Sequence, residues 1–427
     1  MNGYARMVRN LKTPQVMQRL IHLYGNRDGM LVSQTARYIR LIKRHEELYQ
    51  SNENEVLMIS APGRTEIGGN HTDHNSGKVL AAAVNLDTLA AVSRRDDMIV
   101  NLSSEGYEPI RMDLNDLAMK PDETGTTAAV IRGVAARFEQ LNYQIGGFDA
   151  AVTSEVASGS GLSSSAAFEV MLCAIFDVLF NGEKIDFKQR AQIAQYAENV
   201  YFGKPSGLLD QMASAAGGLV FVDFKSEEPK VKPLKFDFAA GGYSLVVVNT
   251  GGSHANLTEH YAAIPKEMKE VAAYFGEKEL RSVRPEQLLN DVAALRGQVS
   301  ERAIMRAIHF FNENERVCKE VEALEKNDIQ AFFENVIASG QSSFMYLQNV
   351  FVDFADQPLS LALCLAQQWL QGKGAWRVHG GGFAGTTLNF VKSKDVSAFV
   401  EKMEKVYGRY TCHILDIRPE GAAVIKL

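Results

Sequence analysis

The residues best suited to chemistry form one stretch at 159–167, Gly-Ser-Gly-Leu-Ser-Ser-Ser-Ala-Ala. It follows an apolar, alternating segment at 148–154 and precedes a helix-like run that starts at Phe168. Glycines ahead of a helix let backbone N–H groups approach a ligand, and the helix N-terminus adds unpaired N–H groups and a positive dipole end. Consecutive hydroxyls add donors and oxygen ligands for magnesium. The stretch therefore predicts a cradle for a polyphosphate, although serines ahead of a helix also serve as simple caps.

Two common nucleotide-binding motifs are excluded for this stretch. No Gly-Lys-Ser/Thr closes it, so it is not a Walker loop, and its spacing differs from that of a dinucleotide fingerprint. The candidate nucleotide-binding residues are Gly159, Ser160, Gly161, Leu162, Ser163, Ser164 and Ser165.

Three further glycine-bearing loops carry polar side chains. A short apolar strand at 56–60 leads into a loop with Arg64 and a segment at 67–78 that is dense in Gly, Asn, His and Asp. The loop at 203–212 places Asp210 where a mostly apolar helix begins, and a fourth loop spans 376–385. Each loop alone also suits a solvated turn, but polar loops that follow strands commonly build ligand sites.

The elements that must position these loops are mixed in both halves of the chain. We expect helices over most of 1–50 and near 128–141, 168–180, 188–199, 208–216, 257–275, 299–349 and 395–407. We expect strands near 56–60, 99–102, 110–114, 148–154, 219–224, 243–249 and 387–391, and two paired strands at 79–84 and 89–93. This order predicts an α+β protein of two domains with the loops converging between them.

Composition narrows the class of protein. A chain of 427 residues with 46% hydrophobic and 22% charged residues is ordinary for a soluble globular protein of two or three domains. The net charge of -6 argues against non-specific nucleic-acid binding and gives no reason to expect an anionic membrane surface as partner. No uninterrupted apolar run is long enough to span a bilayer.

The cysteines give no sign of a metal or disulfide framework. Cys173, Cys318, Cys364 and Cys412 are scattered and form no CxxC pair. We therefore expect reduced thiols in a cytoplasmic protein.

In this order, the four loops resemble those of the GHMP small-molecule kinases and, within them, of the galactokinase family. Residues 64–78 are similar to the galactokinase signature, 159–167 to the family's phosphate loop and 380–385 to its third motif. The resemblance runs from about residue 55 to the C-terminus.

That resemblance implies a two-domain GHMP kinase fold, with a ribosomal protein S5 domain 2-like N-terminal domain and a ferredoxin-like α/β C-terminal domain. We expect a helical extension at 1–50 packed on the N-terminal domain, an N-terminal kinase domain at 51–216 that carries the phosphate loop, and a C-terminal kinase domain at 217–427. The last strand is expected to return to the N-terminal domain.

Site residues follow from the same resemblance. It implies that Arg64 and Asp210 flank the anomeric hydroxyl of a sugar, and that Ser164 and Glu198 hold magnesium. The residues implied to contact the sugar are His71, Asp73, Gly207 and Tyr261. Because Arg64 is expected beside Asp210, the pKa of that carboxyl should fall, which keeps it ionised at neutral pH.

The implied activity is phosphotransfer to an alcohol group, with galactose and ATP giving galactose 1-phosphate and ADP. ATP and Mg²⁺ are the implied cofactors. The expected partners are a small sugar and ATP, without nucleic acid or membrane, and the expected assembly is a monomer or weak oligomer.

Among the positions where this chain departs from the family pattern, positions 70 and 74 leave the sugar open. The usual signature reads Arg-x-Asn-x-Ile-Gly-Glu-His-x-Asp-Tyr, whereas this chain reads Arg-Thr-Glu-Ile-Gly-Gly-Asn-His-Thr-Asp-His from Arg64 to His74. Asn70 replaces the glutamate that contacts the far hydroxyl of the sugar, and His74 replaces the tyrosine. We count both as sugar-binding candidates, because an amide still forms hydrogen bonds to galactose. The loss of a negative charge at 70, with His74 as a source of positive charge, also suits galacturonate, and arabinose or an amino sugar is a weaker alternative.

The base of the nucleotide is a further open point. Thr126 and Thr127 stand where galactokinases often carry an aromatic residue, so ATP is the default among purine triphosphates.

Two other function classes compete with a sugar kinase. A catalytically silent sensor of sugar and nucleotide would tend to have a damaged phosphate loop, whereas this loop is complete and Arg64, Glu198 and Asp210 are present. A kinase for a non-sugar alcohol such as mevalonate is disfavoured by the His71-Thr72-Asp73 signature.

Overall fold

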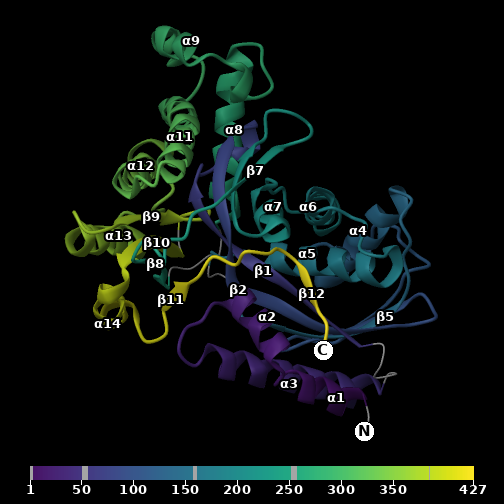
Figure 1. The fold of residues 1–427 in the computed structure, drawn as a ribbon. Helices are drawn as coiled ribbons and strands as arrows, with labels where there is room; N and C mark the ends of the chain where they lie inside the picture. Colours follow the sequence, from purple (N-terminus) through teal and green to yellow (C-terminus); the bar gives the residue numbers. More distant parts are fainter. Residues whose placement is uncertain (1–2, 51–55, 157–160, 252–256, 384) are drawn as a thin grey trace.

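The structure, a computed structural model, describes residues 3–50, 56–156, 161–251, 257–383 and 385–427. Two β-sheets organise this part of the chain, and helices cover both faces of each (Figure 1). The predicted α+β architecture is confirmed.

The larger sheet has the strand order β12-β1-β2-β5-β3-β4, with β6 paired to β2 and β7 paired to β6. All neighbours are antiparallel except β3 and β5. Its strands are β1 Leu57–Gly68, β2 Lys78–Arg94, β3 Ile99–Ser104, β4 Ile110–Asp113, β5 Phe148–Ser154, β6 Leu219–Asp223, β7 Lys230–Leu234 and β12 Ala423–Ile425.

The smaller sheet is antiparallel throughout and has the order β11-β8-β10-β9. Its strands are β8 Tyr243–Asn249, β9 Ala375–His379, β10 Thr386–Lys392 and β11 Cys412–Leu415.

The described helices fall into groups that cover these sheets. They are α1 Gly3–Asn10, α2 Pro14–Tyr24, α3 Met30–Tyr49, α4 Thr127–Gln140, α5 Ser164–Phe176, α6 Phe187–Tyr196, α7 Leu209–Ala216, α8 Thr258–Tyr274, α9 Pro285–Asn290, α10 Val292–Leu295, α11 Glu301–Glu325, α12 Ile329–Ser342, α13 Pro358–Leu370 and α14 Val396–Tyr407. Short π-helical segments extend three of them: η4 Asp177–Asn181 after α5, η5 Ala197–Phe202 after α6 and η7 Ser343–Leu347 after α12.

Alternation along the strands explains why the larger sheet is covered twice. Successive side chains of a strand point to opposite faces, so Ile59 and Ala90 join the core under α4–α7, whereas Met58 and Ala91 join the core under α1–α3. Figure 1 shows α1–α3 lying along one side of the sheet, near the C-terminal strand β12.

The expected pair of strands at 79–84 and 89–93 is wrong, because both belong to the single strand β2. The intervening Asn85 and Asp87 resemble turn residues, but tertiary contacts satisfy them. The Asn85 amide donates to the Tyr24 carbonyl at 3.3 Å, and Arg37 donates to Asp87 at 2.6 Å. Strand β1 also runs further than expected, through Arg64 to Gly68, with a register shift on each side of the 64–66 segment.

The domain boundaries remain a prediction. Strands β6 and β7, which follow the proposed boundary at 216, are hydrogen-bonded into the larger sheet. The last strand, β12, pairs with β1, with Met58 opposite Ile425.

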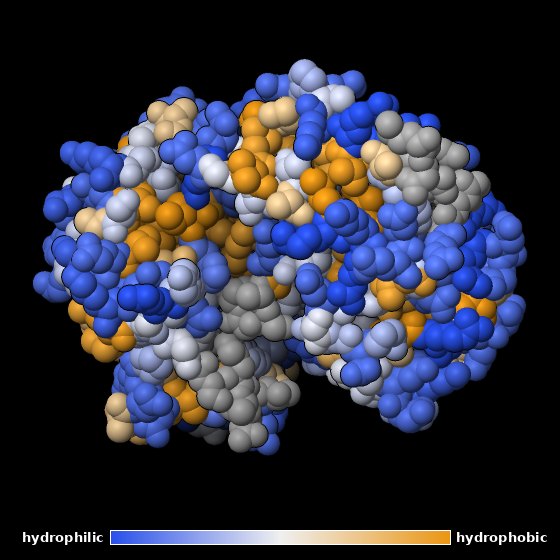
Figure 2. All heavy atoms as spheres, turned by 90° about the horizontal axis from the view of Figure 1, so that it is seen from below, coloured by the Kyte–Doolittle hydropathy of each residue, from blue (hydrophilic) through white to orange (hydrophobic). Residues whose placement is uncertain are grey.

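One helical stretch in the described residues, Ser164–Asn181, is long and apolar enough by length and composition to cross a membrane. It consists of α5 and η4, and most of its apolar residues lie in the core beneath the larger sheet. Buried core helices pass the same test, so this stretch is weak support for a membrane span. On the face drawn in Figure 2, hydrophilic residues predominate and hydrophobic ones form separate patches.

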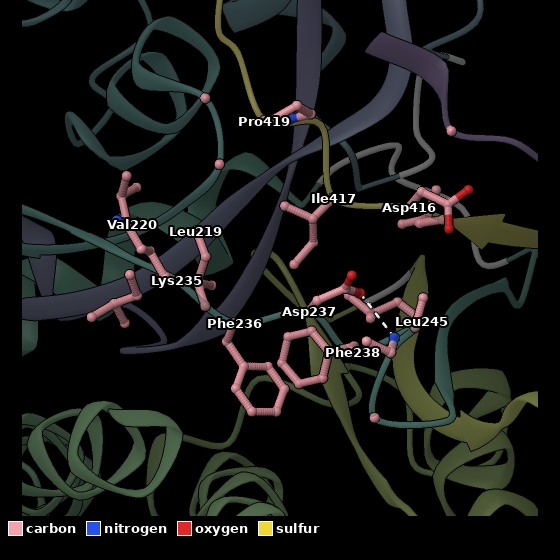
Figure 3. A pocket seen from close by; sticks show the side chains of 18 of the residues that line it. Leu219, Val220, Lys235, Phe236, Asp237, Phe238, Leu245, Asp416, Ile417 and Pro419 are labelled. Carbon is pink, nitrogen blue, oxygen red and sulfur yellow. Dashed lines mark hydrogen bonds between the residues drawn. The ribbon is translucent and has the colours of Figure 1, made fainter. Parts of the chain in front are cut away.

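A cavity of about 1330 Å³ lies where β6–β8 meet the 415–419 segment and the turn after α2. Figure 3 shows apolar side chains, among them Phe236, Phe238 and Ile417, around it, with Asp237 bonded to the backbone N–H of Ala240. None of the predicted site residues lines this cavity, so size alone does not locate the chemistry.

Candidate active site

An ion pair joins the loop that carries Arg64 to the loop at 203–212, at the centre of the candidate site. Arg64 donates to Asp210 through two parallel hydrogen bonds, from Nε to Oδ1 at 2.6 Å and from Nη2 to Oδ2 at 2.6 Å. Arg64 lies in β1 and Asp210 in the first turn of α7. Such a fork fixes both the distance and the plane of the carboxylate.

The same arginine holds the phosphate loop. Its backbone N–H donates to the Leu162 carbonyl at 2.9 Å, and Nη1 donates to the Gly161 carbonyl. Gly161 has φ of 72°, and a Cβ there would overlap the hydroxyl of Thr386 on β10. Glycine is therefore needed at 161, where the phosphate loop approaches β10 next to the loop at 376–385.

Ser163 turns towards the Arg64–Asp210 pair. It has φ of 60°, precedes α5, and its hydroxyl donates to Asp210 Oδ2 at 2.8 Å. Gly159 and Ser160, two of the predicted nucleotide contacts, lie outside the described residues. It stays a prediction that these two residues contact a nucleotide, and the same holds for Gly161, Leu162, Ser163, Ser164 and Ser165.

Burial raises the pKa of Asp210, but the Arg64 charge and the hydrogen bonds from Arg64 and Ser163 outweigh it, and the pKa lies below its ordinary value. The carboxyl is therefore ionised at neutral pH. Its side chain is nevertheless 32% exposed, so a substrate can reach it.

Glu198 lies in the π-helical segment η5, a distortion frequent at functional sites. Lys204 donates to its Oε1 at 2.9 Å, and the Ser206 hydroxyl (2.5 Å) and the Gln211 amide (2.8 Å) donate to Oε2. The phosphate-loop hydroxyl within reach is that of Ser165, at 3.4 Å.

The predicted magnesium donors have chemistry that suits the ion. Carboxylate and hydroxyl oxygens are the ligands that Mg²⁺ takes, and the ion usually has few protein ligands and completes its shell with water and phosphate. Ser164 and Glu198 both line one cavity. The ammonium of Lys204, whose side chain is 58% exposed, already lies 2.9 Å from Glu198 Oε1, so the site holds a cation beside this carboxylate. Among the described residues no three His, Cys, Asp or Glu side chains cluster as a metal cage.

That cavity, of about 290 Å³, extends from the phosphate loop between the larger sheet and α4. Apolar side chains such as Val130 and Phe168 line it together with polar ones such as Thr127 and the buried Glu169. Its lining residues are Thr88, Leu102, Ser104, Tyr107, Glu108, Ile110, Thr127, Val130, Val152, Ser154, Val156, Ser164, Ser165, Phe168, Glu169, Glu198 and Phe202.

The predicted sugar contacts gather at the other side of the ion pair. Asp73 lies against Gly207, because a Cβ on Gly207 would overlap its carboxylate. His74 Nε2 lies 3.8 Å from Asp73 Oδ1. His71 Nε2 is 2.9 Å from the Gly381 carbonyl, and burial lowers the pKa of His71 to about 3, so its imidazole is neutral.

Tyr261 packs on the fourth loop from α8. Its hydroxyl donates to the Gly382 carbonyl at 2.9 Å, and a Cβ on Gly381 would meet its ring. The sugar contacts predicted at His71, Asp73, Gly207 and Tyr261 are thus close to the glycine loops, and their contact with a sugar stays a prediction.

The side chain of Asn70 is not free to contact a sugar. Its side chain is fully buried and bonded to the protein, with the Asn349 amide donating to its Oδ1 at 2.8 Å. Sequence reasoning missed its partners Glu66, Ser343 and Asn349, together with Arg377, which donates to Glu66. Only the position of Glu66 in the signature loop and of Arg377 in the fourth loop gave a signal.

Comparison with known proteins agrees with this geometry. Residues 43–94 match the family described as "Galactokinase galactose-binding signature", and residues 129–218 match "GHMP kinases N terminal domain". The crystal structure of Lactococcus lactis galactokinase complexed with galactose superimposes with a TM-score of 0.79 at 26% identity, covering 89% of this chain and 98% of that one. Methanococcus jannaschii mevalonate kinase shares the fold at a TM-score of 0.61 and 12% identity.

The fold is therefore that of a GHMP kinase, as predicted. Streptomyces coelicolor galactokinase is 34% identical over 86% of this chain and 92% of its own length, and human galactokinase is 31% identical over 87% and 93%. The chain belongs to the galactokinase family, whose members are phosphotransferases with an alcohol group as acceptor.

Proposed function

We propose that the protein is an ATP-dependent sugar 1-kinase whose substrate is galactose. The observation that carries the proposal is the forked Arg64–Asp210 pair, which the phosphate-loop residue Ser163 completes. Phosphoryl transfer needs an oriented oxygen nucleophile and neutralised phosphates, and these groups supply both.

In the proposed reaction the anomeric hydroxyl of the sugar hydrogen-bonds to the ionised Asp210. Its oxygen forms a bond to the γ-phosphorus of ATP as the bond from that phosphorus to the bridging oxygen breaks, and ADP leaves. The hydroxyl proton passes to Asp210, which is a weak base but is well oriented. Arg64 keeps the carboxylate in place and stabilises charge on the transferring group.

The nucleotide is proposed to lie along the phosphate loop, with its base in the apolar cavity beside α4. Ser164 and Glu198 would hold Mg²⁺, with Ser165 as a second hydroxyl close to that carboxylate. When bound, the ion neutralises charge on the phosphates. The sugar is proposed to contact His71, Asp73, Gly207 and Tyr261, and a cytoplasmic location and a monomeric or weakly associated state complete the proposal.

The test is to incubate purified protein with Mg-ATP and a panel of galactose, galacturonate, arabinose and an amino sugar. We expect ADP release that depends on sugar and is fastest with galactose. If no sugar stimulates ADP release while nucleotide still binds, the kinase proposal is wrong and the silent-sensor alternative takes its place.

A further inference from the structure

The side chain of Asn70 has no hydrogen-bonding position left for a substrate. Its Nδ2 donates to Glu66 Oε1 at 2.9 Å and to the Gly380 carbonyl at 2.7 Å. Its Oδ1 accepts from Asn349 Nδ2 at 2.8 Å and from the Ser343 hydroxyl at 3.2 Å. A primary amide has two donor hydrogens and two acceptor lone pairs, so all four are used, and the residue is 0% exposed.

Glu66, the partner of Asn70, has a carboxylate oxygen to spare. Its Oε1 accepts both the Asn70 amide and Arg377 Nη2, the latter at 2.8 Å. Among the described residues no group donates a hydrogen bond to Oε2. This oxygen is also not one of the side-chain atoms that are both buried from solvent and without a hydrogen bond. The side chain as a whole keeps 8% exposure, so it is not sealed from a ligand.

Glu66 lies close to the residues of the candidate sugar site. Arg64 and Glu66 are separated by one residue in a stretch of β1 with regular register, so their side chains project on the same face of the strand. The charges that act on Glu66 come from Arg377 on β9, Arg64 on β1, Asp210 on α7 and Asp73 on the short 3-10 helix η2 Asp73–Asn75. Glu320 on α11 also faces it, and the His379 ring approaches its backbone N–H.

We propose that Glu66 Oε2 contacts a hydroxyl of the sugar and makes the site selective for a neutral sugar over a sugar acid. The inference rests on the proposed function and concerns its substrate class. A carboxylate accepts a hydroxyl hydrogen but repels a second carboxylate. The negative charge missing at Asn70 is thus present four residues earlier, hydrogen-bonded to that same asparagine, and the charge argument for galacturonate loses its basis.

Selectivity should then depend on pH. Burial raises the pKa of Glu66 to about 7, against the opposing effect of Arg377 and Arg64. Above pH 7 the carboxylate is charged and repels an acid, whereas below pH 7 it is protonated and this repulsion is lost. Preference for galactose over galacturonate should therefore weaken from pH 8 to pH 6 in the wild type.

The experiment measures kcat and KM for galactose and galacturonate at pH 8 and pH 6 with wild type and Glu66→Gln. For Glu66→Gln we expect KM for galactose to rise by about tenfold with a smaller change in kcat, because a hydrogen bond to a charged group is lost. The galactose preference should fall and no longer vary with pH. Glu320→Gln is the matched control, since both oxygens of Glu320 are buried and unpartnered and offer a sugar no contact.

The outcomes separate the two proposals. If Glu66→Gln keeps the wild-type KM and the wild-type sugar preference while galactose is still phosphorylated, the role of Glu66 is wrong and the kinase proposal stands. If the wild type phosphorylates neither sugar, the kinase proposal itself fails. Should Glu66→Gln not fold, Glu66→Asp retains the charge but withdraws the oxygen, and an unchanged KM for galactose would contradict the contact.

Discussion

Two Arg–Asp clusters in this molecule contain the same kinds of group but differ in burial. Asp87, on β2, accepts from Arg37 at 2.6 Å, from Arg418 at 3.2 Å, from the Tyr24 hydroxyl at 2.6 Å and from Ser60. It is 0% exposed. This cluster ties helices α2 and α3 and the segment before β12 to the larger sheet.

Asp210 is bonded more sparsely, since among the described residues Arg64 and Ser163 donate to it, and its side chain is 32% exposed. The contrast supports the proposal that Asp210 reacts with a substrate, because part of its carboxylate remains open to a ligand. Fully bonded carboxylates such as Asp87 can only stabilise the fold.

The largest expected effect comes from Asp210→Asn. It removes the group proposed to orient and deprotonate the sugar hydroxyl, and we expect kcat to fall by roughly 10²- to 10⁴-fold, with a smaller fall in Tm than Asp87→Asn causes, because the Asp210 side chain is partly exposed. Sugar-dependent ADP release and thermal melting measure the two quantities. Asp223→Asn, which breaks the partly exposed pair with Arg281, is the matched control and should leave kcat near wild type. Near-normal turnover of Asp210→Asn would remove Asp210 from the mechanism.

For Asp87→Asn we expect the opposite pattern, a loss of stability without a loss of kcat. It leaves Arg37 and Arg418 buried without a full counter-charge, which should destabilise the protein by about 3–5 kcal/mol. Chemical denaturation followed by fluorescence measures this loss, while kcat per folded molecule should be unchanged. A variant with full stability and reduced kcat would reverse the roles assigned to the two clusters.

Acid stability should follow the same distinction. Burial raises the pKa of Asp87, but Arg37 and Arg418 outweigh it, so the folded pKa lies below the ordinary value. The stability that Asp87 provides is therefore complete above the unfolded pKa of about 3.9 and is lost as pH falls through the folded pKa. The free energy of unfolding of wild type should drop more steeply below pH 4 than that of Asp87→Asn, and parallel profiles would contradict this.

Glu198→Gln should have an effect of intermediate size. It should weaken the binding of Mg²⁺ rather than disturb the orientation of the sugar hydroxyl. We expect the Mg²⁺ concentration for half-maximal rate to rise by at least roughly tenfold, because the substitution removes a charged oxygen donor. Titration of activity with Mg²⁺ at fixed ATP measures it. Glu267→Gln, at the partner of Arg302 and Arg306, is the control, and an identical Mg²⁺ titration for both variants would remove Glu198 from the metal site.

The smallest effects should come from removing one hydroxyl from each cluster. Ser163→Ala takes one donor from Asp210 and should lower kcat by about fivefold, equivalent to about 1 kcal/mol. Tyr24→Phe takes one donor from Asp87 and should lower stability by about 1–3 kcal/mol without affecting kcat. The distinction between the two clusters would be contradicted if both variants lowered kcat, or if both lowered only stability.

Sequence reasoning reached the loops but not their detailed contacts. The glycine loops and the residues Arg64, Glu198 and Asp210 could be picked out because Gly, Ser and charged residues stand out locally, and the family resemblance supplied their roles. The position of Ser163 could not be foreseen, since its left-handed φ of 60° directs its hydroxyl to Asp210. The Asp87 cluster was invisible because Arg418 lies 331 positions away from it.

The fold was predicted well where periodicity is strong and poorly where tertiary contacts override local signals. Helix α7 and strand β8 lie close to their expected positions. Strand β2 was split in the prediction because Asn85 and Asp87 look like turn formers, and only their distant partners keep the strand continuous.

The most direct test of the central claim is phosphorus NMR of the product formed from galactose and Mg-ATP by the wild-type protein. With Asp210 acting on the anomeric hydroxyl, the product is a sugar phosphate whose phosphorus couples to the anomeric proton, formed in equal amount with ADP. A phosphate on any other hydroxyl, or intact ATP beside unreacted galactose, would contradict the assignment of the Arg64–Asp210 pair.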